Sequence, residues 1–193
     1  MSITHRCRSL ARIGMAGGLT ALAIGCTEKR VDPTAAPFAE FTRRVDEYVA
    51  LHNAAAEKVG PLDETKSQAE IAARAVALGY AIAAARPQAK QGDIFTIEIA
   101  TVFATMIHEE YSRRPPPVLD TREDTQEELP DFVPKVNELY PTTYPLATFP
   151  PSLLPLLPRL PEDIVEYRIV QKYLILRDVE ANLIIDFMPN ALP

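Results

Sequence analysis

Apolar residues recur at alternating steps of three and four from residue 38 to residue 59, which is the spacing of one face of an α-helix. The stripe consists of Phe38, Phe41, Val45, Tyr48, His52, Ala55 and Val59. Gly60 and Pro61 follow directly and are typical of a helix end. The pattern predicts an amphipathic helix of about six turns whose stripe faces a core.

A second helix is predicted to begin after Ser67, because Ser67 and Glu70 have the spacing of a capping box. Its apolar face consists of Ile71, Ala75, Leu78, Ile82 and Ala85, and Pro87 ends it. The many alanines give this helix a smooth surface that a neighbour can approach closely. Gly79 costs helix stability and is expected where such a neighbour crosses.

A third helix is predicted to start near Gly92 and Asp93, with Asp93 as its N-cap. Its apolar face consists of Ile99, Val102, Phe103, Met106 and Ile107. The β-branched residues of 94–102 also suit a strand, but the helical spacing continues to Tyr111 and favours a helix. Three amphipathic helices of this size are expected to pack as a small antiparallel bundle.

Proline dominates the next region, with 12 prolines among the 47 residues of 115–161. This content excludes a long helix or a central strand. Residues 139–160 alternate proline with Leu, Phe and Tyr, and two interpretations are open. The segment covers an apolar surface of its own protein, or it is a docking segment for a partner.

Three apolar runs close the chain, at Val165–Val170, Tyr173–Asp178 and Leu183–Met188. The short gaps between them predict a three-stranded antiparallel β-meander. Its middle strand is apolar on both faces, so a layer should cover each face.

The predicted fold is therefore of the α+β class. It consists of a helical region at 38–114, a proline-rich and acidic connection at 115–161, and a β-meander at 162–193 packed on the helical region.

The N-terminus has a different pattern, in which basic residues precede an apolar run. His5, Arg6, Arg8 and Arg12 come before the apolar residues 13–24, and Gly25 and Cys26 follow. This order is typical of an export signal, and the run is shorter than the roughly 20 apolar residues of a membrane-spanning helix.

The segment Leu22-Ala23-Ile24-Gly25-Cys26 resembles the lipobox of bacterial lipoproteins. In that family the cysteine thiol is acylated, the chain is cut just before it, and the new amino end is usually acylated too. The resemblance implies a signal peptide at 1–25, fatty acyl groups such as palmitate on Cys26, and a tether at 26–37. It also implies the cell envelope, on the outer membrane facing the periplasm in a Gram-negative host, because Thr27 replaces the Asp that favours inner-membrane retention.

The net charge argues against some classes of partner, and the cysteine content argues against a disulfide. Three of the 20 basic side chains lie in the predicted signal, which leaves 17 basic and 26 acidic side chains and a net charge of −9. This balance argues against nucleic acid and against a basic patch on anionic lipid. After cleavage and acylation neither Cys7 nor Cys26 is left for a disulfide, so the fold is expected to depend on its apolar core.

Two segments resemble parts of other exported bacterial proteins. Residues 166–170, 174–178 and 184–186 resemble a C-terminal hairpin of small exported proteins, including periplasmic nickel/cobalt-homeostasis proteins. Residues 88–96 resemble a segment of exported proteins with no assigned function. These likenesses rest on strand and loop residues, and they carry over no catalytic or metal-binding residue.

Motifs for common chemistries are incomplete. Gly60, Gly79 and Gly92 are too scattered for a phosphate-binding loop. His108-Glu109-Glu110 begins like a zinc-protease motif, but Ser112 replaces its second histidine.

Two interpretations of the remaining titratable residues are open. His52 is expected to be a hydrogen-bonded histidine at the core edge, whereas a metal site would join His52 or His108 to Glu109 or Glu110. Asp178 and Asp186 are the best candidates for perturbed titration, although their positions favour exposed strand faces or turn caps.

The sequence thus assigns one site, lipidation at Cys26, and no catalytic, cofactor-binding or metal-ligating residue. We expect a lipid-anchored envelope protein that acts as a non-enzymatic interaction or structural module. Its partners would be the membrane, through the anchor, and another protein rather than nucleic acid. The alternatives are a metal-binding or metal-sensing envelope protein and a carboxylate-dependent hydrolase.

Overall fold

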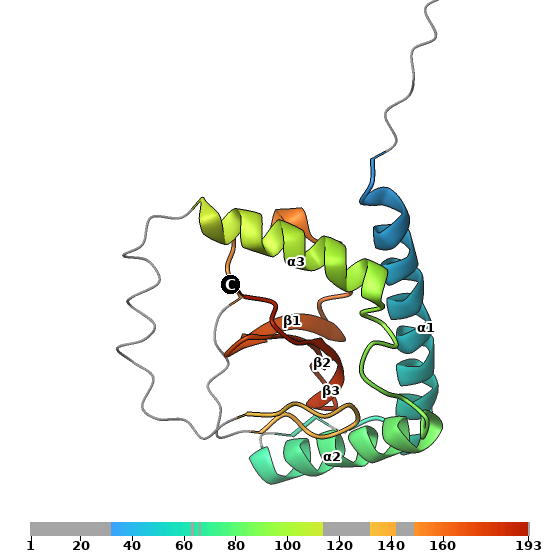
Figure 1. Cartoon of the computed structure of the whole chain (residues 1–193). Coiled ribbons are helices and arrows are strands. Elements are labelled where there is room, and N and C mark those ends of the chain that lie inside the picture. Colours follow the sequence, from blue (N-terminus) through green and yellow to red (C-terminus); the bar gives the residue numbers. More distant parts are fainter. Residues whose placement is uncertain (1–31, 63, 66, 114–131, 142–148, 193) are drawn as a thin grey trace, which may run out of the picture. The chain divides into compact units, whose positions relative to one another are not determined.

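The computed structural model describes residues 32–193, except 63, 66, 114–131, 142–148 and 193. In this part of the chain, three α-helices precede a three-stranded antiparallel sheet (Figure 1). The elements are α1 (Ala35–Val59), α2 (Gln68–Ala85), α3 (Ile97–Ser112), the 3₁₀ turn η1 (Leu154–Leu156), β1 (Val165–Val170), β2 (Tyr173–Asp178) and β3 (Leu183–Met188). The predicted α+β class and the order of helices before a β-meander are confirmed.

The first two helices follow the sequence signals closely. α1 begins three residues before the predicted stripe, because Pro37 is tolerated in a first helical turn. It ends before Gly60, which has a positive φ of 84°. At the start of α2, the Ser67 side chain accepts a hydrogen bond from the Glu70 N–H at 3.4 Å, as the capping-box spacing predicts.

The third helix starts later than predicted. Thr96 rather than Asp93 caps α3, since the Thr96 side chain accepts from the Ile99 N–H. Asp93 instead accepts from the Lys90 N–H within the preceding loop. The cause is a carboxylate on β3, Asp186, which binds backbone N–H groups of residues 92–95 and keeps them out of the helix.

The sheet has the order β1-β2-β3, and its strands have the predicted bounds. Val170 pairs with Tyr173 across a two-residue turn, and Asp178 pairs with Leu183 across a four-residue loop. A register shift at Leu176 makes a β-bulge, so that Ile185 is the extra residue on β3.

The helices share their core with the sheet as well as with one another. α1 packs against both α2 and α3, while the sheet lies between α3 and α2 in Figure 1. Phe41 of α1 and Phe103 of α3 contact the Tyr167 ring of β1 at 6.1 and 6.3 Å between ring centroids. The three helices therefore pack around the sheet, with α1 joining the other two, rather than only on one another.

The proline-rich connection covers parts of both sheet faces, as the first of the two interpretations predicts. On the helix-covered face it buries Phe149, Leu153 and Leu157 in the main core. On the other face, Phe132 and Tyr140 form a second cluster with Val170, Ile175 and Ile184. These apolar side chains fix the path of a segment that proline keeps out of regular secondary structure.

The outer edge of β3 is also covered by this connection. The backbone N–H groups of Asn137 and Tyr140 donate to the carbonyl oxygens of Ile184 and Asn182, and the Ile184 N–H donates to Glu138. A Cβ atom at Gly79 of α2 would lie 3.1 Å from Leu139 of this segment. The predicted close neighbour at Gly79 is therefore confirmed, and it is an extended segment rather than a helix.

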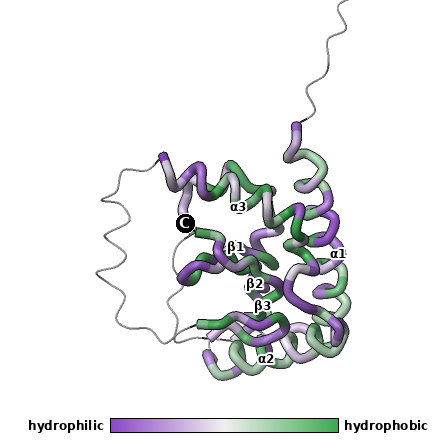
Figure 2. Tube along the Cα trace, viewed as in Figure 1, coloured by the Kyte–Doolittle hydropathy of each residue, from purple (hydrophilic) through white to green (hydrophobic). Residues whose placement is uncertain are grey.

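α2 is hydrophobic along most of its length (Figure 2), and Glu70 and Arg74 are its charged residues. Of its side chains, Leu78 and Ile82 are buried together with Gly79. Among the described helices, none is long and apolar enough to cross a membrane.

Candidate functional site

Asp178, at the end of β2, is the centre of a buried polar cluster. Tyr48 of α1 donates its hydroxyl to Asp178 Oδ2 at 2.7 Å, and His52 Nδ1 lies 2.6 Å from the same oxygen. The Ala181 N–H donates to Asp178 Oδ1 at 2.7 Å. Asp178 therefore caps the β2–β3 turn, which is one of its two expected positions, and α1 crosses the end of β2 and buries it completely.

His52 bridges two carboxylates. Its Nδ1 faces Asp178, and its Nε2 lies 3.2 Å from Glu180 Oε2. Burial lowers the pKa of His52, but the hydrogen bonds and negative charges of Asp178 and Glu180 outweigh burial and raise the pKa above its usual range. The interpretation as a hydrogen-bonded core histidine is confirmed.

The cluster continues to α2 through an ion pair. Arg74 lies 3.1 Å from Glu180 and donates its Nε to the Gly60 carbonyl oxygen at 3.0 Å. The side chains thus connect α1, α2 and the β2–β3 turn. This arrangement fixes three elements relative to one another.

Asp186 forms the second buried carboxylate site. Its Oδ1 accepts from the N–H groups of Gly92 and Phe187 at 2.9 and 2.8 Å, and its Oδ2 accepts from Ile94 and Phe95 at 2.7 and 2.8 Å. Burial raises the pKa of Asp186, while these four donors oppose the rise. The side chain is fully buried, so the expectation of an exposed strand face is wrong for Asp186.

Both carboxylates are therefore committed to hydrogen bonds that hold the fold together. Acid–base catalysis needs a carboxylate within reach of a substrate, and neither Asp178 nor Asp186 lines the grooves described below. These observations give the hydrolase alternative no support.

The other predicted candidates are not brought together. His108, Glu109 and Glu110 lie on α3, and the Ser112 hydroxyl donates to the His108 carbonyl oxygen. Within the described ranges, no three His, Cys, Asp or Glu side chains are placed to hold a metal ion. Cys26 lies outside the described residues.

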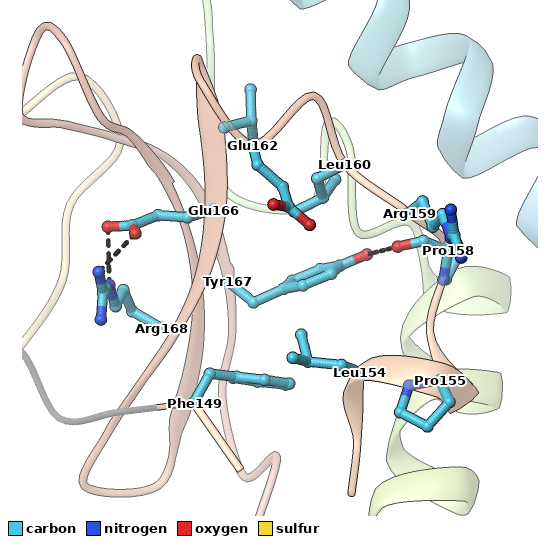
Figure 3. Close-up of a pocket in the computed structure, with 11 residues that line it drawn as sticks. Phe149, Leu154, Pro155, Pro158, Arg159, Leu160, Glu162, Glu166, Tyr167 and Arg168 are labelled. Carbon is cyan, nitrogen blue, oxygen red and sulfur yellow. Dashed lines mark hydrogen bonds and ion pairs between the residues drawn. The ribbon is translucent and has the colours of Figure 1, made fainter. Parts of the chain in front are cut away.

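A groove runs beside β1 and has a volume of about 770 Å³. We call it the β1 groove (Figure 3), and one of its walls is the segment 149–162. Its lining consists of Phe149, Leu154, Pro155, Pro158, Arg159, Leu160, Glu162, Val165, Glu166, Tyr167 and Arg168. Seven of these eleven residues are apolar or aromatic and four are charged, so the groove suits a ligand that combines apolar side chains with polar or charged groups.

Buried and exposed side chains alternate along the proline-rich segment, and the buried ones hold the groove wall in place. Leu153 and Leu157 are buried on either side of η1, which leaves Leu154 52% exposed at the groove. The Tyr167 hydroxyl donates to the Pro158 carbonyl oxygen at 3.0 Å, and Figure 3 shows this bond crossing from β1 to the wall. The Phe149 ring packs 5.5 Å from the Tyr167 ring.

Some of the charged side chains at the groove form ion pairs with described residues, and others do not. Glu166 accepts from Arg168 Nε at 2.7 Å and also binds Arg177. Arg159 and Glu162 are exposed, and neither has an ion pair with another described residue. Within the described part of the chain, Arg159 therefore presents a guanidinium without an ion-pair partner beside an apolar surface.

A second apolar surface, with smaller cavities, lies along α2. A cavity of about 530 Å³ between α2 and the β2–β3 turn adjoins one of about 320 Å³, and they share Val76 and Leu139. Their exposed large apolar residues are Ile71, Val76, Tyr80, Leu139 and Val179. We call this surface the α2 groove.

Sequence reasoning missed both grooves and the role of Glu180 and Arg74. The stripe of α1 does place Tyr48 and His52 on one face, one helical turn apart, which is a signal that they share a partner. Nothing in the sequence points to Asp178 as that partner, because it lies 126 residues beyond His52.

No protein-family model matches the chain, and no curated protein or solved structure is significantly similar to it.

Proposed function

We propose that this chain is a lipid-anchored protein of the bacterial cell envelope that acts as a non-enzymatic binding module for a partner protein. The β1 groove is the observation that carries the proposal. An open groove with apolar walls is typical of an interaction site on a folded protein.

The polar residues support the same proposal. Asp178, His52 and Asp186 are buried and saturated with hydrogen bonds from the protein itself. Among the described residues, the groove offers a ligand apolar surface, backbone groups and the exposed side chains of Arg159 and Glu162, which have no ion pair there. Its lining contains no histidine, serine or cysteine, so these groups suit the binding of a partner rather than the activation of a nucleophile.

The anchor is tested by the Cys26→Ser variant. The wild-type protein should fractionate with membranes and lose this behaviour in the variant, because the thiol is the acylation site and two acyl chains are needed for stable attachment. Mass spectrometry of the N-terminal peptide measures the acyl groups directly. A wild-type protein that is entirely soluble and carries no lipid would contradict the proposed anchor.

The binding role is tested by a photo-crosslinking amino acid placed in the groove. At Leu154, which lies in the groove wall, it should give a discrete crosslinked product in cells. At Val133, which is 65% exposed and lies outside the groove, it should not. Equal labelling at the two positions would argue against a binding role for the groove.

A further inference from the structure

β1 is an edge strand whose outer side offers backbone hydrogen-bonding groups. Val170 and Tyr173 flank a two-residue turn, so they form a hydrogen-bonded pair and the pattern alternates from there. Glu166 and Arg168 therefore bond to β2, whereas Tyr167 and Ile169 direct their N–H and C=O groups to the outer edge.

One hydrogen bond supports this assignment. The Val165 N–H, which belongs to the outer set, donates to the Pro161 carbonyl oxygen rather than to β2. In the part of the chain that the structure describes, neither Tyr167 nor Ile169 has a backbone bond to a residue outside the sheet. By contrast, residues 137–140 cover the outer edge of β3. Among the described residues, the edge of β3 is thus covered and the outer groups of Tyr167 and Ile169 are not.

The β1 groove adjoins this edge at residues 165–168, and Ile169 lies just beyond its lining. In a strand added to β1, alternate side chains would share the sheet face of Tyr167 and so meet Phe149, Leu154 and Leu160. The side chains between them would share the face of Glu166 and Arg168. The groove therefore fits an extended chain with apolar residues at every second position.

The charged side chains of the groove indicate which extended chains it would favour. Glu166 is already bound by two arginines, so it does not demand a cation from the ligand. Arg159 has no ion pair among the described residues, and Figure 3 shows it on the wall opposite β1. A carboxylate on the ligand would complement this guanidinium.

We infer that the partner is an extended peptide segment that adds a strand to the open edge of β1, with alternating apolar side chains in the groove and an acidic residue at Arg159. This inference rests on the proposed function and specifies its mode of binding. Main-chain bonds to Tyr167 and Ile169 supply the attachment, and the groove and Arg159 supply the selectivity.

The test uses a fluorescein-labelled nonapeptide in which valine and threonine alternate around a central aspartate. Fluorescence anisotropy with the purified full-length protein, held in nanodiscs if it carries lipid, measures its affinity. Two further peptides carry N-methyl groups on one or the other set of alternate residues. Only the set facing β1 donates to the edge, so one methylated peptide should bind about tenfold more weakly and the other should bind like the parent.

Arg159→Ala should lower the affinity for the aspartate peptide about threefold to fivefold and leave the affinity for an asparagine analogue unchanged. Glu162→Gln should raise the affinity for the aspartate peptide, since it removes a carboxylate that competes with the peptide for Arg159. Lys172→Ala is the matched control, because Lys172 is an exposed cation in the turn after β1 and does not line the groove. Hydrogen exchange should slow at residues 165–170 when the parent peptide binds.

Four results would overturn the inference. The first two are the absence of peptide binding up to about 1 mM and equal binding of both methylated peptides. The third is slow hydrogen exchange at residues 165–170 before peptide is added. The fourth is the same slow hydrogen exchange in a dimer that forms without peptide. The third result would place another part of this chain on the edge, and the fourth would place a second copy there. A missing crosslink at Leu154 or a missing anchor would instead contradict the proposed function.

Discussion

His52 shows how one residue can join the helical region to the sheet. Both of its ring nitrogens face carboxylate oxygens, and a neutral imidazole has one N–H donor for two such partners. The imidazolium form satisfies both. Protonation is therefore coupled to the contact between α1 and the β2–β3 turn.

The sign of the pH effect follows from the raised pKa of His52. A raised pKa in the folded state stabilises the fold fully below the unfolded value of about 6.5, and this contribution is lost as the pH rises through the folded pKa. The free energy of unfolding, measured by urea titration, should therefore fall between pH 6 and pH 9 in the wild-type protein. In His52→Gln this dependence should disappear, and stability at pH 6 should drop by about 3 kcal/mol.

Tyr48→Phe is the matched control for this prediction. It removes another hydrogen bond to Asp178 without removing a group that titrates near neutral pH, so its loss of about 1 to 2 kcal/mol should be similar at pH 6 and pH 8. If the pH dependence of the wild-type protein survives in His52→Gln, the imidazolium assignment is wrong.

At the scale of elements, the sequence predicts regular structure better than it predicts its connections. The strand bounds, the end of α1 and the capping box of α2 follow from local chemistry, namely alternation, Gly60 and Ser67. The start of α3 does not, because Asp186 competes for the N–H groups of the loop before it. The two buried aspartates look like exposed or turn-capping residues locally, and their partners come from segments about 90 and 126 residues away.

The β1 groove is unpredictable from sequence for a related reason. The predicted β-meander places β1 and β3 at the edges of the sheet, but it does not predict which edge the proline-rich connection covers. That choice depends on where Tyr140, Leu153 and Leu157 find apolar surface. The candidate site is thus a product of the long connection rather than of a motif.

Asp186 makes a testable link between β3 and the loop before α3. In Asp186→Asn the side chain keeps one acceptor oxygen and places an NH₂ group against backbone donors, so about two of the four N–H groups lose their partner. We expect a loss of about 3 kcal/mol in unfolding free energy. Hydrogen exchange should accelerate at residues 92–95 more than at residues 48–52. Uniform acceleration across the chain would show that Asp186 does not hold this loop specifically.

At the scale of the whole molecule, the helices and the sheet depend on each other for a core. Residues 32–193 form a single compact unit, and the main core joins side chains of α1, α2 and α3 to those of all three strands. The sheet alone would expose two apolar faces, which three short strands cannot sustain in water. The helices alone would expose the faces that now contact Tyr167, Leu174 and Leu183.

We therefore predict that the protein unfolds as one cooperative unit despite its proline-rich connection. A fragment of residues 32–114 should lose most of its helicity and its sigmoidal thermal transition in circular dichroism, because α2 and α3 each lose their contacts with the sheet while α1 alone joins them. Deletion of residues 27–31 is the control, since these residues precede the compact unit and their loss should leave the transition unchanged. A fragment of 32–114 with a cooperative transition at the wild-type temperature would require two independent domains, and the connection would then be a linker between them.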